Sequence, residues 1–128
     1  MSQQNLAGNL MAHGYDVVAY FENEARVGDP ALAVEHEGVR YYFANETNKK
    51  QFEENPARYV PAYGGWCAYA MSEGKQFDID PRSFKVTNDR LYLFYDGVGG
   101  CTIDIWNEDE TGRAQKADSV WRSGSYSD

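Results

Sequence analysis

The sequence predicts an α+β fold, a single small domain in which two β-hairpins pack with short helices. Pairs of short runs rich in β-forming residues flank the turn dipeptides Glu37-Gly38 and Asn88-Asp89. Segments with helix start and stop signals lie between these pairs, and 128 residues with 42% hydrophobic side chains suffice for one core. We expect an N-terminal arm over residues 1–13, a domain over 14–122 and a frayed tail over 123–128.

The segment 14–21 is compatible with two structures. It contains strand-forming side chains, yet Asp16 is also a suitable N-cap for one short helical turn, and both interpretations stay open. Residues 32–36 and 39–43 form the first predicted hairpin. A helix then runs from a cap at Asn45 or Thr47 to about Glu54, and Pro56 ends it and opens a further turn through Tyr59.

The rest of the chain predicts a second set of similar elements. Gly64-Gly65 precedes a helix-compatible stretch over 66–73 that ends at Gly74. Residues 83–87 and 90–95 form the second predicted hairpin, and a polar helix is expected over 111–121, although the structure of residues 97–122 is otherwise not legible. No internal repeat beyond the two hairpins is evident, and no linker divides the chain.

The charge balance excludes several classes of function. Twelve Lys and Arg against twenty Asp and Glu give a net charge of −8, which disfavours a nucleic-acid surface. No apolar run is long enough to cross a membrane, and the first residues lack an export signal. We therefore expect a soluble, acidic, cytoplasmic protein, or a periplasmic one if a leader has been removed. The two cysteines, Cys67 and Cys101, are expected to be free thiols.

Enzyme motifs are missing from the sequence. There is no nucleophile elbow, no phosphate-binding glycine loop and no HExxH, so hydrolases and nucleotide enzymes are not indicated. Asp78 and Asp80 could form a hard-metal cup, but an Asp-Pro pair is more often an ordinary turn. We expect a non-enzymatic module.

Cys67 is the principal candidate for chemistry. It follows two glycines at the start of a predicted helix, where unpaired backbone N–H groups favour the thiolate form. The alternative is a small apolar side chain in the core. Met71 lies four residues later, so a thioether would share its helical face and could supply a second soft donor, or simply fill the core.

Further candidates could complete a site around this thiol. His36 could pair with Cys67 or act as its base, or it could be a strand-end histidine bonded to its neighbours, whereas His13 is expected to be exposed. The aromatic residues Tyr63, Trp66 and Tyr69 could wall off a bound cofactor from water.

The order of several motifs resembles the YHS domain family. The matching blocks are GYDVVAYF at 14–21, HEGVRYYF at 36–43, Phe52 with Asn55-Pro56 and Tyr59, and YGGWCAY at 63–69. They are most similar to small stand-alone bacterial members, over roughly residues 14–95. The resemblance implies a metal-binding module, but Ala19 and Ala44 stand where metal-associated members carry thiols.

From these residues and this resemblance we expect a module that handles a soft metal. With few donors, two-coordinate Cu(I) fits better than a zinc site with four ligands. The expected ligands are Cys67, His36 and Met71, and the expected partner is the metal ion or a metal-trafficking protein. Two alternatives remain: a redox protein that uses the Cys67 thiol, or a metal-free module that binds a partner or small ligand through its tyrosines.

Overall fold

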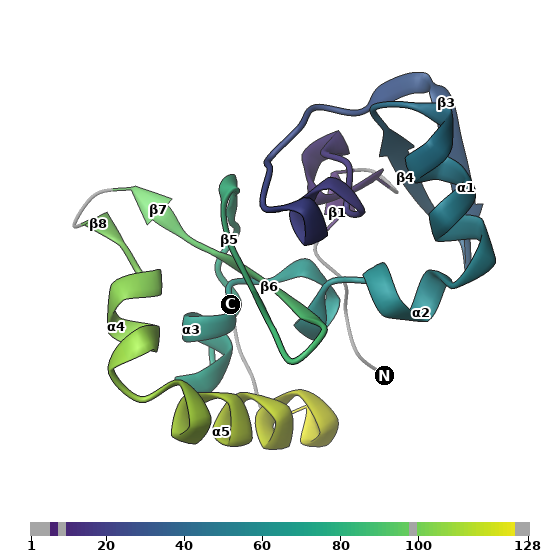
Figure 1. The fold of residues 1–128 in the computed structure, drawn as a ribbon. Coiled ribbons are helices and arrows are strands. Elements are labelled where there is room, and N and C mark those ends of the chain that lie inside the picture. Colours follow the sequence, from purple (N-terminus) through teal and green to yellow (C-terminus); the bar gives the residue numbers. More distant parts are fainter. Residues whose placement is uncertain (1–5, 8–9, 98–99, 125–128) are drawn as a thin grey trace.

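The computed structural model describes residues 6–7, 10–97 and 100–124, and it confirms the α+β fold (Figure 1). The α-helices are α1 (Glu46–Glu54), α2 (Pro56–Tyr59), α3 (Ala68–Ser72), α4 (Ile103–Glu108) and α5 (Glu110–Ser123). Three short 3₁₀ helices are η1 (Ala12–Gly14), η2 (Ala19–Glu22) and η3 (Ala62–Gly65). The strands are β1 (Leu6–Ala7), β2 (Leu10–Met11), β3 (Asp29–His36), β4 (Val39–Phe43), β5 (Asp80–Thr87), β6 (Arg90–Phe94), β7 (Asp96–Gly97) and β8 (Gly100–Cys101).

The first hairpin belongs to a four-stranded sheet with the order β1-β2-β4-β3, in which β4 is an inner strand and β3 an edge strand. β3 and β4 pair antiparallel, and Glu37 and Gly38 turn the chain with φ angles of 52° and 80°. Strand β2, which we expected to belong to an N-terminal arm, pairs parallel with β4 at Leu10 and Arg40. Met11 is fully buried, so this part of the chain contributes to the core.

The second hairpin forms as predicted. β5 and β6 pair antiparallel, and Asn88 and Asp89 both have positive φ, at 53° and 61°. Positive φ at both central residues suits the right-handed twist of the flanking strands. β7 and β8 form a further short antiparallel pair.

The helix signals act at the expected places. Asn45, rather than Thr47, caps α1 by accepting a hydrogen bond from the Asn48 backbone at 2.8 Å. The open question at 14–21 is settled as a short helical turn: η2 follows Asp16, whose carboxylate accepts from the backbones of Val18 and Ala19. The polar C-terminal helix is α5; residues 125–128 of the expected tail lie outside the described part of the chain.

The chain contains an internal repeat, and it extends beyond the two hairpins to which our expectation limited it. A constant shift of 51 residues superimposes the strand registers: Asp29 pairs with Phe43, and Asp80 pairs with Phe94. Both hairpins have a register irregularity after this Asp-Pro pair, and in both the Asp accepts from the backbone two residues later, at 2.9 Å. The repeat is therefore one of backbone geometry.

The same shift relates the segments before each hairpin. Positive φ angles of 55°, 54° and 85° at residues 12–14 recur as 58°, 60° and 86° at residues 63–65. Asp16 donates its backbone N–H to Arg26 at 2.8 Å, and Cys67 donates to Phe77 at 3.0 Å. We call residues 12–59 the first repeat and residues 63–123 the second repeat.

An aromatic ring from the following helix packs on each hairpin. In the first repeat Phe52 of α1 lies 4.6 Å from Tyr41 and 5.2 Å from Phe43, measured between ring centroids. In the second repeat Trp106 of α4 lies 5.0 Å from Tyr92 and 5.5 Å from Phe94. Both repeats thus bury one helix on one face of their hairpin.

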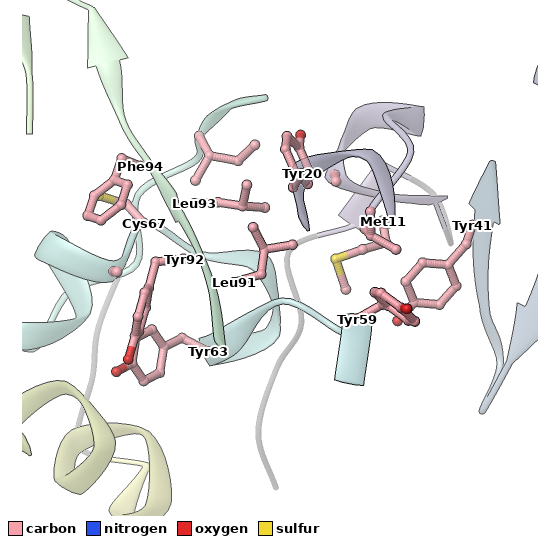
Figure 2. Packing of buried hydrophobic residues seen from close by; sticks show 14 of the residues in the cluster. Met11, Tyr20, Tyr41, Tyr59, Tyr63, Cys67, Leu91, Tyr92, Leu93 and Phe94 are labelled. Carbon is pink, nitrogen blue, oxygen red and sulfur yellow. The ribbon is translucent and has the colours of Figure 1, made fainter. Parts of the chain in front are cut away.

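The two repeats share one core across the β5–β6 hairpin. Figure 2 shows Leu91 and Leu93 on the side of Met11 and Tyr59, while Tyr92 and Phe94 lie on the opposite side. Tyr20 of the first repeat packs on Phe84 at 4.7 Å and donates its hydroxyl to the backbone oxygen of Pro81 at 2.5 Å. Burial of these apolar faces joins the repeats into one unit.

Candidate site around Cys67

Cys67 is the N-cap of α3 and is fully buried. Its Sγ atom accepts a hydrogen bond from the Ala70 backbone at 3.5 Å and lies 3.4 Å from the Thr102 hydroxyl. The helix start predicted from the two glycines is thus present, one residue after the cysteine. Cys67 belongs to the buried hydrophobic cluster drawn in Figure 2, and its backbone forms an isolated parallel bridge with Leu93 of β6.

Thr102 is the hydrogen-bonding neighbour of the Cys67 sulfur. The Thr102 hydroxyl donates to the Tyr95 backbone oxygen at 3.0 Å. Because a hydroxyl has one proton to donate, its oxygen is left to accept from the Cys67 S–H group. Thr102 is therefore the polar side chain next to the Cys67 sulfur, and the sequence reasoning did not single it out.

Asp16 occupies the position of Cys67 in the first repeat. Its buried carboxylate accepts four hydrogen bonds, which come from Val18 N at 2.8 Å, Ala19 N at 3.1 Å, Ala44 N at 2.9 Å and Asn48 Nδ2 at 2.8 Å. The first repeat therefore uses this position to hold an anion by convergent donors. Recurrence of Asp-Pro before each hairpin was the sequence signal that could have revealed the correspondence.

The structure places the three expected metal ligands in both repeats. Met71 is fully buried in α3, four residues after Cys67. His36 ends β3 in the first repeat, where its ring packs edge-on against Phe52 at 5.9 Å and its Nε2 lies 3.9 Å from a Glu37 carboxylate oxygen. His36 and Cys67 share no hydrogen bond, ion pair or ring contact, and across the described residues no three His, Cys, Asp or Glu side chains form a metal-binding group.

The expected aromatic wall is divided among different contacts. Tyr63 is buried against Tyr92 with ring centroids 6.0 Å apart, and its hydroxyl donates to Asp118 of α5 at 2.8 Å. The Tyr69 ring lies under the Arg113 guanidinium at 4.7 Å, and Trp66 is half-buried. Tyr63 and Tyr69 therefore both contact side chains of α5.

A charged network surrounds the Tyr63 hydroxyl. Arg90 donates two hydrogen bonds to Asp118, at 2.9 and 3.1 Å, and stacks over the Tyr63 and Tyr92 rings. Desolvation raises the pKa of Tyr63, and its bond to Asp118 raises it further. Desolvation opposes ionisation of Asp118, but the hydrogen bonds from Arg90 and Tyr63 outweigh it and lower its pKa below the ordinary value.

The other candidate residues take part in ordinary contacts. Asp80 accepts from Arg82, and this side-chain bond lowers the pKa of Asp80, while Asp78 binds His13 at 2.9 Å. Both aspartates line an open cavity of about 450 Å³ that also includes Tyr15 and Tyr95. The side chain of Cys101 lies outside the described part of the structure.

The chain matches no family model, no curated protein and no solved structure with which it was compared. Among the helices of the described residues, none has the length and apolar character required to cross a membrane.

Proposed function

We propose that this protein is a YHS-like module that binds a soft metal ion, copper(I) above all, through the Sγ atom of Cys67. The observation that supports the proposal is the correspondence of Cys67 with Asp16, whose carboxylate accepts four hydrogen bonds in a buried position. A position that holds an anion in one repeat suits a thiolate in the other. Thiolate is the ligand type that soft monovalent metals prefer.

The resemblance to YHS domains favours the same place in the fold. Ala19 and Ala44, which stand where metal-associated members carry thiols, both donate their backbone N–H groups to Asp16. Under the repeat shift, Ala19 corresponds to Ala70 and Ala44 to Tyr95. Ala70 donates to Cys67 Sγ, and Tyr95 accepts from the Thr102 hydroxyl that contacts this sulfur. The family pattern therefore points to the surroundings of Asp16, and the repeat relates that position to Cys67.

The available donors favour Cu(I) over zinc. Met71 lies in the short helix that Cys67 caps, so this helix and its cap offer one thiol and one thioether, both fully buried. Two soft donors suit Cu(I), whereas structural zinc usually needs four Cys or His ligands. Metal uptake would displace a proton from the Cys67 thiol, because a thiolate is the form that binds the metal.

Titration with Cu(I) against a competing chelator tests the proposal. We expect Cys67→Ser and Cys67→Asp to lower the affinity by more than about a hundredfold, because a primary ligand is lost, and Met71→Leu to lower it by about tenfold. His36→Ala is the matched control, since this imidazole packs on Phe52 in the other repeat.

Cys67→Asp places in the second repeat the residue that the first repeat uses. Because the buried Cys67 position has fewer donors than the Asp16 position, the isosteric Cys67→Ser is the variant that we expect to stay folded while it loses copper, so that loss of the thiol is separated from loss of the fold. Equal copper retention by the wild type and Cys67→Ser, or no retention by either, would contradict the metal proposal.

Thiol redox chemistry is a second candidate, because Cys101 directly precedes the residue whose hydroxyl contacts Cys67 Sγ. A peroxide would oxidise the Cys67 thiolate to sulfenic acid and be reduced to water or an alcohol. The Cys101 thiol would then displace the sulfenic hydroxyl, which leaves as water, to form a disulfide. Mass spectrometry after peroxide treatment would find this Cys67–Cys101 disulfide, and a lasting sulfenic acid or unmodified thiols would argue against it.

A further inference from the structure

We propose that helix α5 is a salt-sensitive strap that controls access to the Cys67 thiol. This inference deepens the proposed function and rests on it, because it supplies the regulation of that same site. A fully buried sulfur can meet neither a metal nor a reagent until some part of its cover moves. Exposure of the sulfur therefore depends on which neighbouring element moves away first.

Helix α3, which Cys67 caps, packs against α5. Figure 1 shows α5 running across α3, and the two helices are in close contact. Within α3, only Tyr69 is not buried. At five residues α3 is too short to persist without a neighbour to pack against. Release of α5 would therefore loosen the turn in which Cys67 is the cap.

Polar contacts fasten α5 to α3. The Arg113 guanidinium donates to Ser72 Oγ at 3.2 Å and to a Glu73 carboxylate oxygen at 2.8 Å, and it stacks over the Tyr69 ring. Lys116 lies 3.8 Å from the same Glu73 oxygen. Two cations of α5 thus converge on one carboxylate at the end of α3.

A second set of polar contacts fastens α5 to the β5–β6 hairpin. Asp118 binds Arg90 at 2.9 Å and accepts from the Tyr63 hydroxyl at 2.8 Å. Glu110 lies 3.1 Å from Lys85 Nζ. Charged contacts therefore hold α5 from Glu110 to Asp118.

Apolar anchoring of α5 is weak by comparison. Of its 14 residues, Ala117 is the one that is fully buried, while Ala114, Val120 and Trp121 are partly buried and pack against the core. The corresponding helices of the first repeat bury the large side chains Phe52 and Tyr59, and α4 buries Trp106 completely. Cavities of about 280 Å³ and about 450 Å³ lie on the hairpin side of α5 and between its start and Glu73.

These features make α5 the element that opens most easily. Partly exposed ion pairs contribute little each and are screened by salt, whereas apolar burial is not. Local opening of such an element requires less free energy than global unfolding. Raised ionic strength should therefore expose Cys67 while β6 and the shared core stay folded.

The test is alkylation of Cys67 by iodoacetamide in the full chain without metal, followed by peptide mass spectrometry. Raising NaCl from about 0.01 M to about 1 M, which shortens the screening length from about 30 Å to about 3 Å, should accelerate alkylation about tenfold. Arg113→Gln should accelerate it about tenfold at low salt and weaken the salt response. Arg82→Gln is the matched control, because it removes an exposed ion pair with Asp80 that does not involve α5.

Hydrogen exchange separates strap opening from unfolding. In Arg113→Gln, amides of α5 should exchange faster while amides of β6 keep the wild-type rate. Equal acceleration in β6, or alkylation that ignores both salt and Arg113, would overturn the proposal. Failure of copper binding would leave these rates unchanged, so the strap and the metal proposal can fail separately.

Discussion

At the scale of single residues, one backbone position accommodates two different side chains. Asp16 and Cys67 both precede a short helix, and both accept a hydrogen bond from the backbone three residues later. The carboxylate has four donors, whereas the sulfur has one N–H donor and one hydroxyl neighbour. The first position is therefore a structural anchor, and the second has lone pairs free for other chemistry.

Removal of the two side chains should differ in its effect on folding. We expect Asp16→Ala to lower the free energy of unfolding by about 3 kcal/mol or more, because it leaves buried donors without an acceptor. Cys67→Ala should cost about 1 kcal/mol, since it removes one weak acceptor. Urea denaturation of both variants at neutral pH measures the difference. Equal losses would show that the two positions are not distinct in their energetics.

At the scale of elements, the two hairpins place different residues at equivalent turn positions, and the backbone has a positive φ at each of them. Gly38 and Asp89 are equivalent positions with φ angles of 80° and 61°. A β-carbon added at Gly38 would meet no atom within 4 Å, so only the backbone angle opposes a side chain there. Both hairpins were predictable because turn chemistry is local.

Exchange of these turn residues tests that reading. Gly38→Ala should destabilise the protein by about 1–2 kcal/mol, the cost of a left-handed conformation for a residue with a β-carbon. Asp89→Gly should leave stability equal or raise it by up to about 1 kcal/mol. Thermal unfolding of the two variants measures both changes in stability. If Gly38→Ala leaves the stability unchanged, the left-handed backbone at this position is not strained by a β-carbon.

At the scale of the whole molecule, the core includes several buried tyrosines. Desolvation is the largest cause of a raised pKa at Tyr20, Tyr41, Tyr63 and Tyr92, and it raises the pKa of Tyr41 to about 12. The unfolded chain loses these protons near the ordinary value of 10.0, while the folded chain keeps them. Stability should therefore fall as the pH rises above about 10.

Tyr41→Phe should reduce this alkaline loss. In the wild type, the contribution of Tyr41 to stability is fully present below the ordinary pKa of 10.0 and is lost as the pH rises toward about 12. The variant should lose less stability than the wild type across that window, as measured by urea unfolding at several pH values. Tyr95→Phe, at a half-buried position beside the open cavity, is the control. Parallel curves for Tyr41→Phe and the wild type would contradict the assignment.

Much of the local structure was determined by the sequence itself. The Glu37-Gly38 and Asn88-Asp89 turns, the Asn45 cap and the helix that begins after Gly64-Gly65 follow from interactions between residues close in the chain. For the same reason, the sequence indicated that Cys67 stands at a helix start.

Tertiary structure alone decided the environment of the site. It brought Thr102 to the Cys67 sulfur, kept His36 in the other repeat and laid α5 across α3. These contacts join residues far apart in the chain, and no local pattern encodes them. The repeat could not be predicted from the sequence for a related reason. Packing and backbone angles define each repeated position, so different residue types, such as Asp and Cys or Phe and Trp, can occupy equivalent positions.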